Sequence, residues 1–138
     1  MTFQITSPGG YQQLATTLKW LAVAATLVLA VVILLFAFAP PRPQMSNGIK
    51  DKILHFTAFA TLVLPCAIFM ARSLVWVLPL ALAFGGAIEL LQPGFGRHAS
   101  WADFQADVLG VVVGTALGLA LRFLIKRHVS RPKISRPV

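Results

Sequence analysis

Residues 20–39 read WLAVAATLVLAVVILLFAFA, a run of twenty residues without a charged side chain. As a helix, such a run is long enough to cross the roughly 30 Å hydrocarbon core of a bilayer. Three further apolar runs follow at residues 53–71, 74–92 and 104–125, with short connections between them. Because short loops join neighbouring antiparallel helices, the sequence predicts an all-α membrane protein, an antiparallel bundle of four transmembrane helices.

The composition agrees with this fold class, since 57% of the residues are hydrophobic and only 12% are charged. We expect one membrane domain at residues 20–125, between an N-terminal segment (1–19) and a basic tail (126–138). Residues 37–39, Ala-Phe-Ala, resemble a signal-peptide cleavage site, but the apolar run before them is longer than the roughly 7–15 residues of a signal core. Pro40 would also hinder cleavage there. We therefore interpret the first run as a retained anchor helix.

Basic residues are distributed unevenly between the two predicted membrane faces. The face shared by the N-terminus, the loop at Arg72 and the tail carries eight basic residues and no acidic one: Lys19, Arg72, Arg122, Lys126, Arg127, Arg131, Lys133 and Arg136. The positive-inside rule makes this face cytoplasmic. We therefore expect a multi-pass protein of a bacterial inner membrane with both termini in the cytoplasm. The tail has no aromatic platform for nucleic acid, and we expect its partners to be anionic membrane lipids.

All four acidic residues fall on the opposite, external face, at the ends of three spans. The candidate site residues are Asp51 and His55, then Glu89, Gln92 and Arg97, then Asp103 and Asp107. Carboxylates in apolar helices are costly, so they usually face a bundle interior, a partner or a cavity. We predict that this cluster lines one cavity open to the external leaflet, with Glu89 and Asp107 deepest. Lys52 is expected to point away, toward the headgroups.

The start of the fourth span carries two packing signals. Residues 100–103, Ser-Trp-Ala-Asp, match a capping box with Ser100 as the N-cap. Glycines at 110, 114 and 118 then recur every four residues. Because such a small-residue stripe lets another helix approach closely, we expect this face to be packed inside the bundle.

Each polar residue also has a purely structural interpretation. Asp103 could serve only as a helix cap, His55 as a hydrogen-bonded packing residue, and Arg97 as a headgroup anchor. Glu89 and Asp107 differ from these because each lies a turn or more inside its span. An intramembrane carboxylate is a functional-site hypothesis by default.

The ordered polar residues also resemble a known family. The pattern is Asp51-Lys52-x-x-His55-x-x-x-Phe59, then Glu89-x-x-Gln92, then Arg97-x-x-Ser100-x-x-Asp103-x-x-x-Asp107-x-x-Gly110-x-x-x-Gly114. Over residues 51–118 it resembles the VanZ-like family of small bacterial membrane proteins, many of which carry Asn where this chain has Asp107. The family name comes from a protein linked to reduced sensitivity to the glycopeptide teicoplanin. The resemblance thus implies a cell-envelope membrane protein and supplies no reaction.

Three functions stay open at this point. The first is an enzyme acting on a lipid-linked envelope intermediate or another phosphate-bearing lipid: His55, backed by Asp51, would be the base, Glu89 the acid, and Arg97 the phosphate ligand. The second is a non-enzymatic accessory protein that binds such a lipid. The third is a small proton-coupled carrier, which is disfavoured because no duplicated half is visible, although a homo-oligomer could supply one.

A divalent metal is a minority alternative. Four carboxylates and His55 form an oxygen-rich set that suits magnesium, calcium or manganese better than zinc. No compact ligand spacing such as H-E-x-x-H is present, so the sequence by itself assigns no cofactor.

Overall fold

The described part of the chain forms four long helices. The computed structural model describes residues 8–40 and 48–129, and its long helices are α1 (Pro8–Ala37), α2 (Ile49–Phe69), α3 (Leu74–Leu91) and α4 (Trp101–Val129). Short 3-10 turns flank α3 on both sides, η1 (Ala71–Ser73) and η2 (Gln92–Phe95). All four long helices are apolar and long enough to cross a membrane. The predicted fold class, an all-α multi-pass membrane bundle, is confirmed.

Three of the helices extend beyond the apolar runs that predicted them: α2 begins four residues early, at Ile49, and the other two are α1 and α4. α1 begins at Pro8, inside the segment expected to precede the membrane domain, and α4 continues to Val129, past the expected start of the tail. Apolar composition marks the part of a helix that lies in lipid, whereas backbone hydrogen bonding continues through polar residues. The remaining predicted tail lies outside the described residues.

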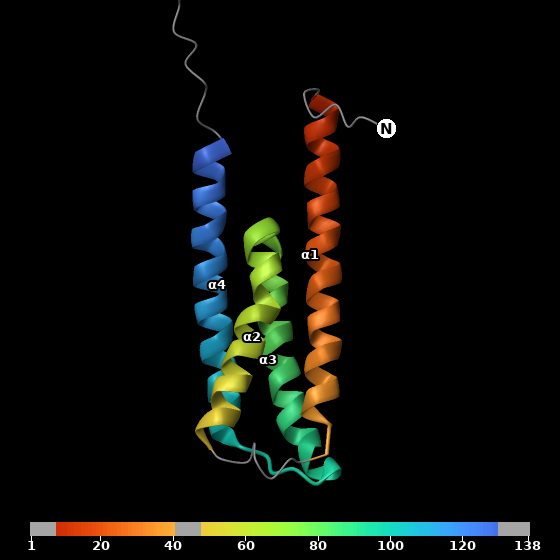
Figure 1. Ribbon diagram of the computed structural model, residues 1–138, viewed down its shortest axis with the longest axis vertical. Helices are drawn as coiled ribbons and strands as arrows, with labels where there is room; N and C mark the ends of the chain where they lie inside the picture. The colour runs from red at the N-terminus through yellow and green to blue at the C-terminus, as the bar shows by residue number, and fades with distance from the viewer. Residues whose placement is uncertain (1–7, 41–47, 130–138) are drawn as a thin grey trace, which may run out of the picture.

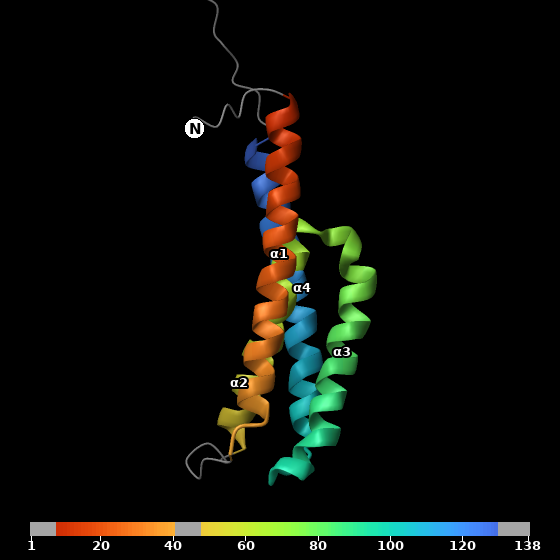
Figure 2. The same cartoon turned by 90° about the vertical axis from the view of Figure 1, so that its right-hand side faces the viewer.

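Consecutive helices run in opposite directions, so α2 and α4 run parallel to each other (Figure 1). In the same view α2 lies between α1 and α4. The view turned by 90° shows α3 on one side of these three helices (Figure 2). α1 begins and α4 ends at one end of the bundle, which we call the terminal end. The four acidic residues lie toward the other end, which we call the acidic end. At the terminal end α1 and α4 continue past the end of α2.

The closest and most extensive helix contact joins α2 and α4, and the predicted glycine stripe makes it possible. A Cβ on Gly110 would overlap the carbonyl oxygen of Phe56, and one on Gly114 would lie 2.7 Å from the Cα of Ala60. Gly118 continues the same contact one turn later. The partner atoms belong mainly to the backbone of α2, which cannot move aside as a flexible side chain can. The stripe therefore faces the bundle interior, as predicted.

The interior is apolar, and the outer surface is apolar as well. A buried cluster receives residues from all four helices: Ala37, Phe59, Leu62, Val63, Ala81, Ile88 and Val111. Large side chains such as Leu27, Trp76, Leu80 and Leu117 are more than half exposed on the outside. Water would disfavour such a surface, whereas lipid accommodates it. The fold thus agrees with a bilayer as its solvent.

Replacing Gly114 by leucine should destabilise the bundle by about 1–3 kcal/mol or more, because the new side chain has no space against the backbone of Ala60. Thermal unfolding in detergent, followed by circular dichroism, measures this effect. Ala116→Leu is the matched control, since Ala116 lies exposed on the same helix. Equal stability of the two variants would show that the stripe does not pack against α2.

Candidate functional site

His55 lies at the centre of the polar cluster and contacts two other helices. Its Nδ1 atom is 2.9 Å from Oδ1 of Asp107 on α4 and 3.9 Å from Oε1 of Glu89 on α3. Asp107 is completely buried, and Glu89 is 7% exposed. Three helices therefore bring polar side chains to one point, and the two intramembrane carboxylates face the same interior.

Gly85 makes room for the carboxylate of Asp107. A Cβ on Gly85 would lie 2.9 Å from Oδ2 of Asp107 and 3.2 Å from the ring of Phe59. Gly85 and Glu89 stand four residues apart, so they occupy the same face of α3. One face of α3 therefore leaves space at Gly85 for the carboxylate of Asp107 and also carries the carboxylate of Glu89.

Glu89 connects the end of α3 to the start of α4. Its Oε2 atom accepts a hydrogen bond of 2.7 Å from the backbone N–H of Ser100. The Ser100 hydroxyl in turn accepts the N–H of Asp103 at 3.3 Å, which confirms Ser100 as the N-cap. The reciprocal half of the predicted capping box is wrong: Glu89, not Asp103, binds the Ser100 N–H. An aspartate is one methylene shorter than the glutamate that usually completes this motif.

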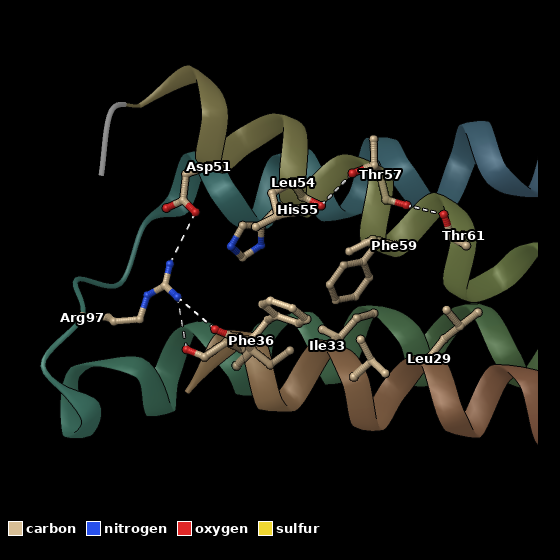
Figure 3. A pocket seen from close by; sticks show the side chains of 14 residues that line it. Leu29, Ile33, Phe36, Asp51, Leu54, His55, Thr57, Phe59, Thr61 and Arg97 are labelled. Atoms are coloured by element: carbon tan, nitrogen blue, oxygen red, sulfur yellow. Dashed lines mark hydrogen bonds and ion pairs between the residues drawn. The ribbon is translucent and has the colours of Figure 1, made fainter. Parts of the chain in front are cut away.

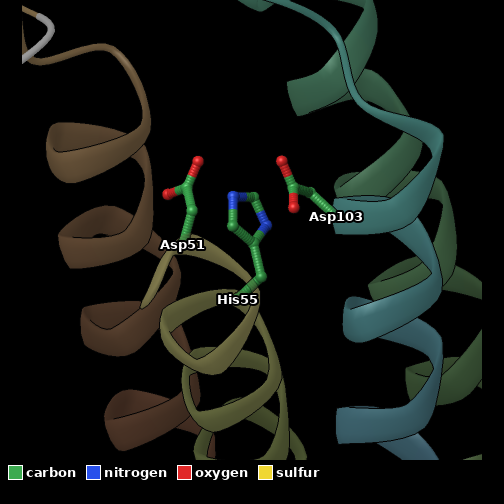
Figure 4. Close-up of side chains that lie close together, drawn as sticks. All are labelled: Asp51, His55 and Asp103. Atoms are coloured by element: carbon green, nitrogen blue, oxygen red, sulfur yellow. The ribbon is translucent and has the colours of Figure 1, made fainter. Parts of the chain in front are cut away.

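Two ion pairs surround His55 on its outer side. Arg97 Nη2 is 3.4 Å from Oδ1 of Asp51, and Lys52 Nζ is 3.7 Å from Oδ1 of Asp103. The imidazole ring lies between the carboxylates of Asp51 and Asp103 (Figure 4). The expectation that Lys52 points away from the cluster is wrong. Because α2 and α4 approach so closely, its amine reaches the first turn of α4.

Arg97 and Gln92 both donate to the C-terminal end of α1. Arg97 Nη1 lies 3.2 Å from the carbonyl oxygen of Phe36 and 3.5 Å from that of Ala37. Gln92 Nε2 lies 3.5 Å from the same Ala37 oxygen. The last carbonyls of a helix have no partner within it, so they need such donors. Gln92 is therefore a buried helix-capping residue outside the group around His55, whereas Arg97 joins α1 to Asp51.

A cavity of about 290 Å³ opens beside His55, between α1 and α2. Its polar end is formed by Asp51, His55 and Arg97 (Figure 3). Its remaining length, which we call the furrow, has apolar walls that include Leu29, Ile33, Phe36, Leu54, Ala58 and Phe59. Sequence reasoning missed the contribution of α1, because a uniformly apolar helix carries no residue that marks one face as a binding surface. Glu89, Asp103 and Asp107 lie behind His55 and do not line the cavity.

This arrangement determines what His55 can do. An Nδ1–H that donates to Asp107 leaves Nε2 as the acceptor of a neutral imidazole, and Nε2 has no hydrogen-bond partner among the described residues. A group bound in the cavity could therefore give its proton to His55. The acid that orients this histidine is Asp107. The expectation that Asp51 does so is wrong, because its carboxylate pairs with Arg97.

Among the described residues, three buried carboxylate oxygens of the cluster accept no hydrogen bond: Oε1 of Glu89, Oδ2 of Asp107 and Oδ1 of Asp103, the last of which is ion-paired with Lys52. Within residues 8–40 and 48–129, two residue sets could hold a metal ion, and both include His55: one with Asp51 and Asp103, the other with Glu89 and Asp107. In each set, one possible ligand atom per residue lies within 4.8 Å of the others. Asp51 and His55 share α2, whereas Asp103 and Asp107 come from α4 and Glu89 from α3. Each set therefore needs the contact between helices to bring its members together.

The chain matches no protein-family model, no curated protein and no solved structure. The geometry of the candidate residues is therefore the basis for their proposed roles.

Replacing Asp107 by alanine should lower the stability by about 1–3 kcal/mol, because the buried Nδ1–H of His55 loses its acceptor. Asp107→Asn is the matched control, since its amide oxygen can still accept that hydrogen bond. Thermal unfolding in detergent measures both variants, and ¹⁵N NMR of the wild type should show a protonated Nδ1 on His55. Equal losses in the two variants would contradict a role for the hydrogen bond.

Proposed function

We propose that this chain is a VanZ-like cell-envelope protein of a bacterial inner membrane, with both termini in the cytoplasm and the acidic end at the outer leaflet. There the cavity beside His55 binds a lipid that has a phosphate-bearing head, as lipid-linked envelope intermediates do. Because the sequence resembles the VanZ-like family, the proposal associates this lipid binding with resistance to glycopeptides of the teicoplanin type. One observation carries the proposal: a single cavity joins a charged end to an apolar furrow.

The two parts of the cavity match the two parts of an amphipathic lipid. The furrow between α1 and α2 offers apolar walls to a hydrocarbon chain, whose burial there is favourable even where the surrounding solvent is lipid, because packed contacts are gained. The polar end offers the guanidinium of Arg97, whose planar fork suits a phosphate. Its 3.4 Å contact with Asp51 leaves other N–H groups of the guanidinium able to donate.

A second candidate function, catalysis on the bound lipid, is favoured by the pair formed by His55 and Asp107. An imidazole that is oriented by a carboxylate and faces a cavity is the usual arrangement of a general base. In this role His55 would remove a proton from a hydroxyl group or a water molecule beside the lipid head. Glu89 cannot act directly as the acid, because it does not line the cavity.

The charge balance of the cluster favours a bound cation as well. Four carboxylates face two permanently charged bases, Lys52 and Arg97, so two negative charges stay uncompensated when His55 is neutral. Buried carboxylates are tolerated when they are paired, protonated or coordinating. A divalent cation held by His55, Glu89 and Asp107 would take the place of the Nδ1 proton of His55, compensate these charges and satisfy the unpartnered oxygens of Glu89 and Asp107.

The orientation can be tested by cysteine labelling in intact cells. Gly94 and Arg127 lie exposed at opposite ends of the bundle, and the native Cys66 is buried. A membrane-impermeant maleimide should label Gly94→Cys and leave Arg127→Cys unlabelled until the cells are permeabilised. The unsubstituted chain supplies the background. The reverse pattern would place the acidic end in the cytoplasm and remove the basis for an external site.

Lipid binding can be tested with a photoactivatable polyprenyl phosphate in vesicles that contain the full chain. Ile33→Trp should fill the furrow and lower capture by about tenfold, which corresponds to the lost burial of roughly two methylene groups. Leu35→Trp is the matched control, since Leu35 points outward on the same helix. Equal capture by these two variants would sink the proposal.

Catalysis can be separated from binding with the same vesicles. If His55 is a base, His55→Gln should keep capture of the polyprenyl phosphate and abolish its turnover, measured by the release of its head or the appearance of a modified lipid. Addition or chelation of magnesium shows whether a divalent cation contributes. Capture without any turnover by the unsubstituted chain would leave binding as the function.

A further inference from the structure

A second cavity, of about 370 Å³, lies at the terminal end, and the proposed external site does not use it. Its lining residues come from α1, from the end of α2 and from α4. Figure 1 shows that α1 and α4 continue past the end of α2. Three basic residues line it, Lys19 from α1 and Arg122 and Lys126 from α4. The other lining residues are apolar, Phe69 and Ile125 among them. All four acidic side chains lie at the opposite end of the bundle, so no side-chain carboxylate compensates this charge.

Arg122 is held in place at the inner side of this cavity. Its Nη1 atom donates a hydrogen bond of 2.7 Å to the carbonyl oxygen of Ile68. Ile68 belongs to the last turn of α2, whose carbonyls have no partner within the helix. A guanidinium has five N–H donors, so this bond fixes its position and leaves the others available. Arg122 is therefore an oriented cation, and its hydrogen-bond partner among the described residues is a neutral carbonyl group.

Two exposed tryptophans indicate how deep these cations lie in the membrane. Trp20 follows Lys19 directly and is 70% exposed, and Trp76, near the start of α3, is 72% exposed. Tryptophan side chains that face lipid concentrate at the level of the headgroups. Lys19 and Lys126 are exposed too, and their long apolar stems let the amines reach this level. The basic residues of the cavity are thus placed at the depth of phospholipid phosphates.

From this charge, depth and lining we infer a second binding site: the phosphate of an anionic phospholipid from the leaflet at the terminal end binds between Lys19, Arg122 and Lys126. Arg122 would bind the phosphate from the inner side, and the two lysines would approach it from α1 and α4. Basic pockets between transmembrane helices commonly accept anionic headgroups in this way. The upper parts of the acyl chains would contact Phe69 and Ile125. A lipid in this position would bridge α1 and α4 beyond the end of α2.

The occupant we infer is a lipid and not a free anion, because the cavity combines three cations with apolar walls. A free phosphate would gain from the cations but would leave the apolar lining without a matching partner. The phosphate of a phospholipid arrives with chains that such a lining can contact. The inference also holds independently of the external site, since the two cavities share no residue.

The test measures lipid selectivity with the full chain in phosphatidylcholine vesicles. Spin-labelled phosphatidylglycerol and spin-labelled phosphatidylcholine report, by electron paramagnetic resonance, the association of each lipid with the protein. The wild type should prefer phosphatidylglycerol. The double variant Lys19→Gln/Lys126→Gln should lose about fivefold in this preference for each lysine removed, since each nearby basic residue contributes about that factor. Both lysines are exposed, so their replacement leaves the packing unchanged.

Arg127→Gln is the matched control, because Arg127 is adjacent to Lys126 but does not line the cavity. An equal loss of preference in this control would show general surface attraction and overturn the site. An unchanged preference in the double variant would overturn it as well. Excess inorganic phosphate at constant ionic strength should not displace the spin-labelled phosphatidylglycerol, and complete displacement would show a site for the free anion. Arg122→Lys, which keeps the charge but loses the planar fork, should weaken the preference while the bundle stays folded.

Discussion

The hydrogen bond between His55 and Asp107 is the interaction on which the acidic end depends. It joins α2 to α4 in a region where an unpaired polar group would be costly, because no water is available to replace the missing partner. The bond can form only because α4 approaches α2 backbone to backbone along Gly110 and Gly114. Gly85 provides the corresponding space on α3. Small residues on two helices therefore determine where the charged residues of three helices meet.

The polar cluster has an inner part, which is enclosed by helices, and an outer part, which borders the cavity. In the inner part, His55, Glu89 and Asp107 are enclosed by helices, and Glu89 also holds the backbone of Ser100 at the start of α4. In the outer part, Asp51 and Arg97 border the cavity and connect it to the end of α1. His55 belongs to both parts, since one ring nitrogen is bonded to Asp107 and the ring lines the cavity. A ligand in the cavity would therefore be coupled to buried carboxylates that it does not touch.

The two ends of the bundle carry opposite charge, and each end has a cavity with apolar walls. At the acidic end, negative charge exceeds positive charge within a compact group of side chains. At the terminal end, Lys19, Arg122 and Lys126 surround a cavity without an acidic side chain. The fold produces this difference because α1 and α4 are longer than α2 and α3. Where the shorter helices end, the longer ones leave space between them, and Arg122 caps the exposed carbonyl of Ile68.

The sequence by itself determined the helical membrane fold, the inward direction of the glycine stripe and the grouping of the acids at one end. These properties depend on local hydrophobicity, on helical periodicity and on the order of polar residues along the chain, all of which can be read without the partners. It also identified Ser100 as a helix cap, because that bond is made within one turn. It did not determine which acid binds which base. The i,i+4 spacing favoured Asp51 as the partner of His55, whereas Asp107, 52 residues away, holds that position. Tertiary packing likewise decided three further features. It paired Lys52 with Asp103, it gave the Ser100 N–H to Glu89, and it made α1 the apolar wall of the cavity. The physical reason is that hydrogen bonds and ion pairs depend on differences of a few ångströms between atoms on separate helices, and only the close approach of α2 and α4 sets those distances.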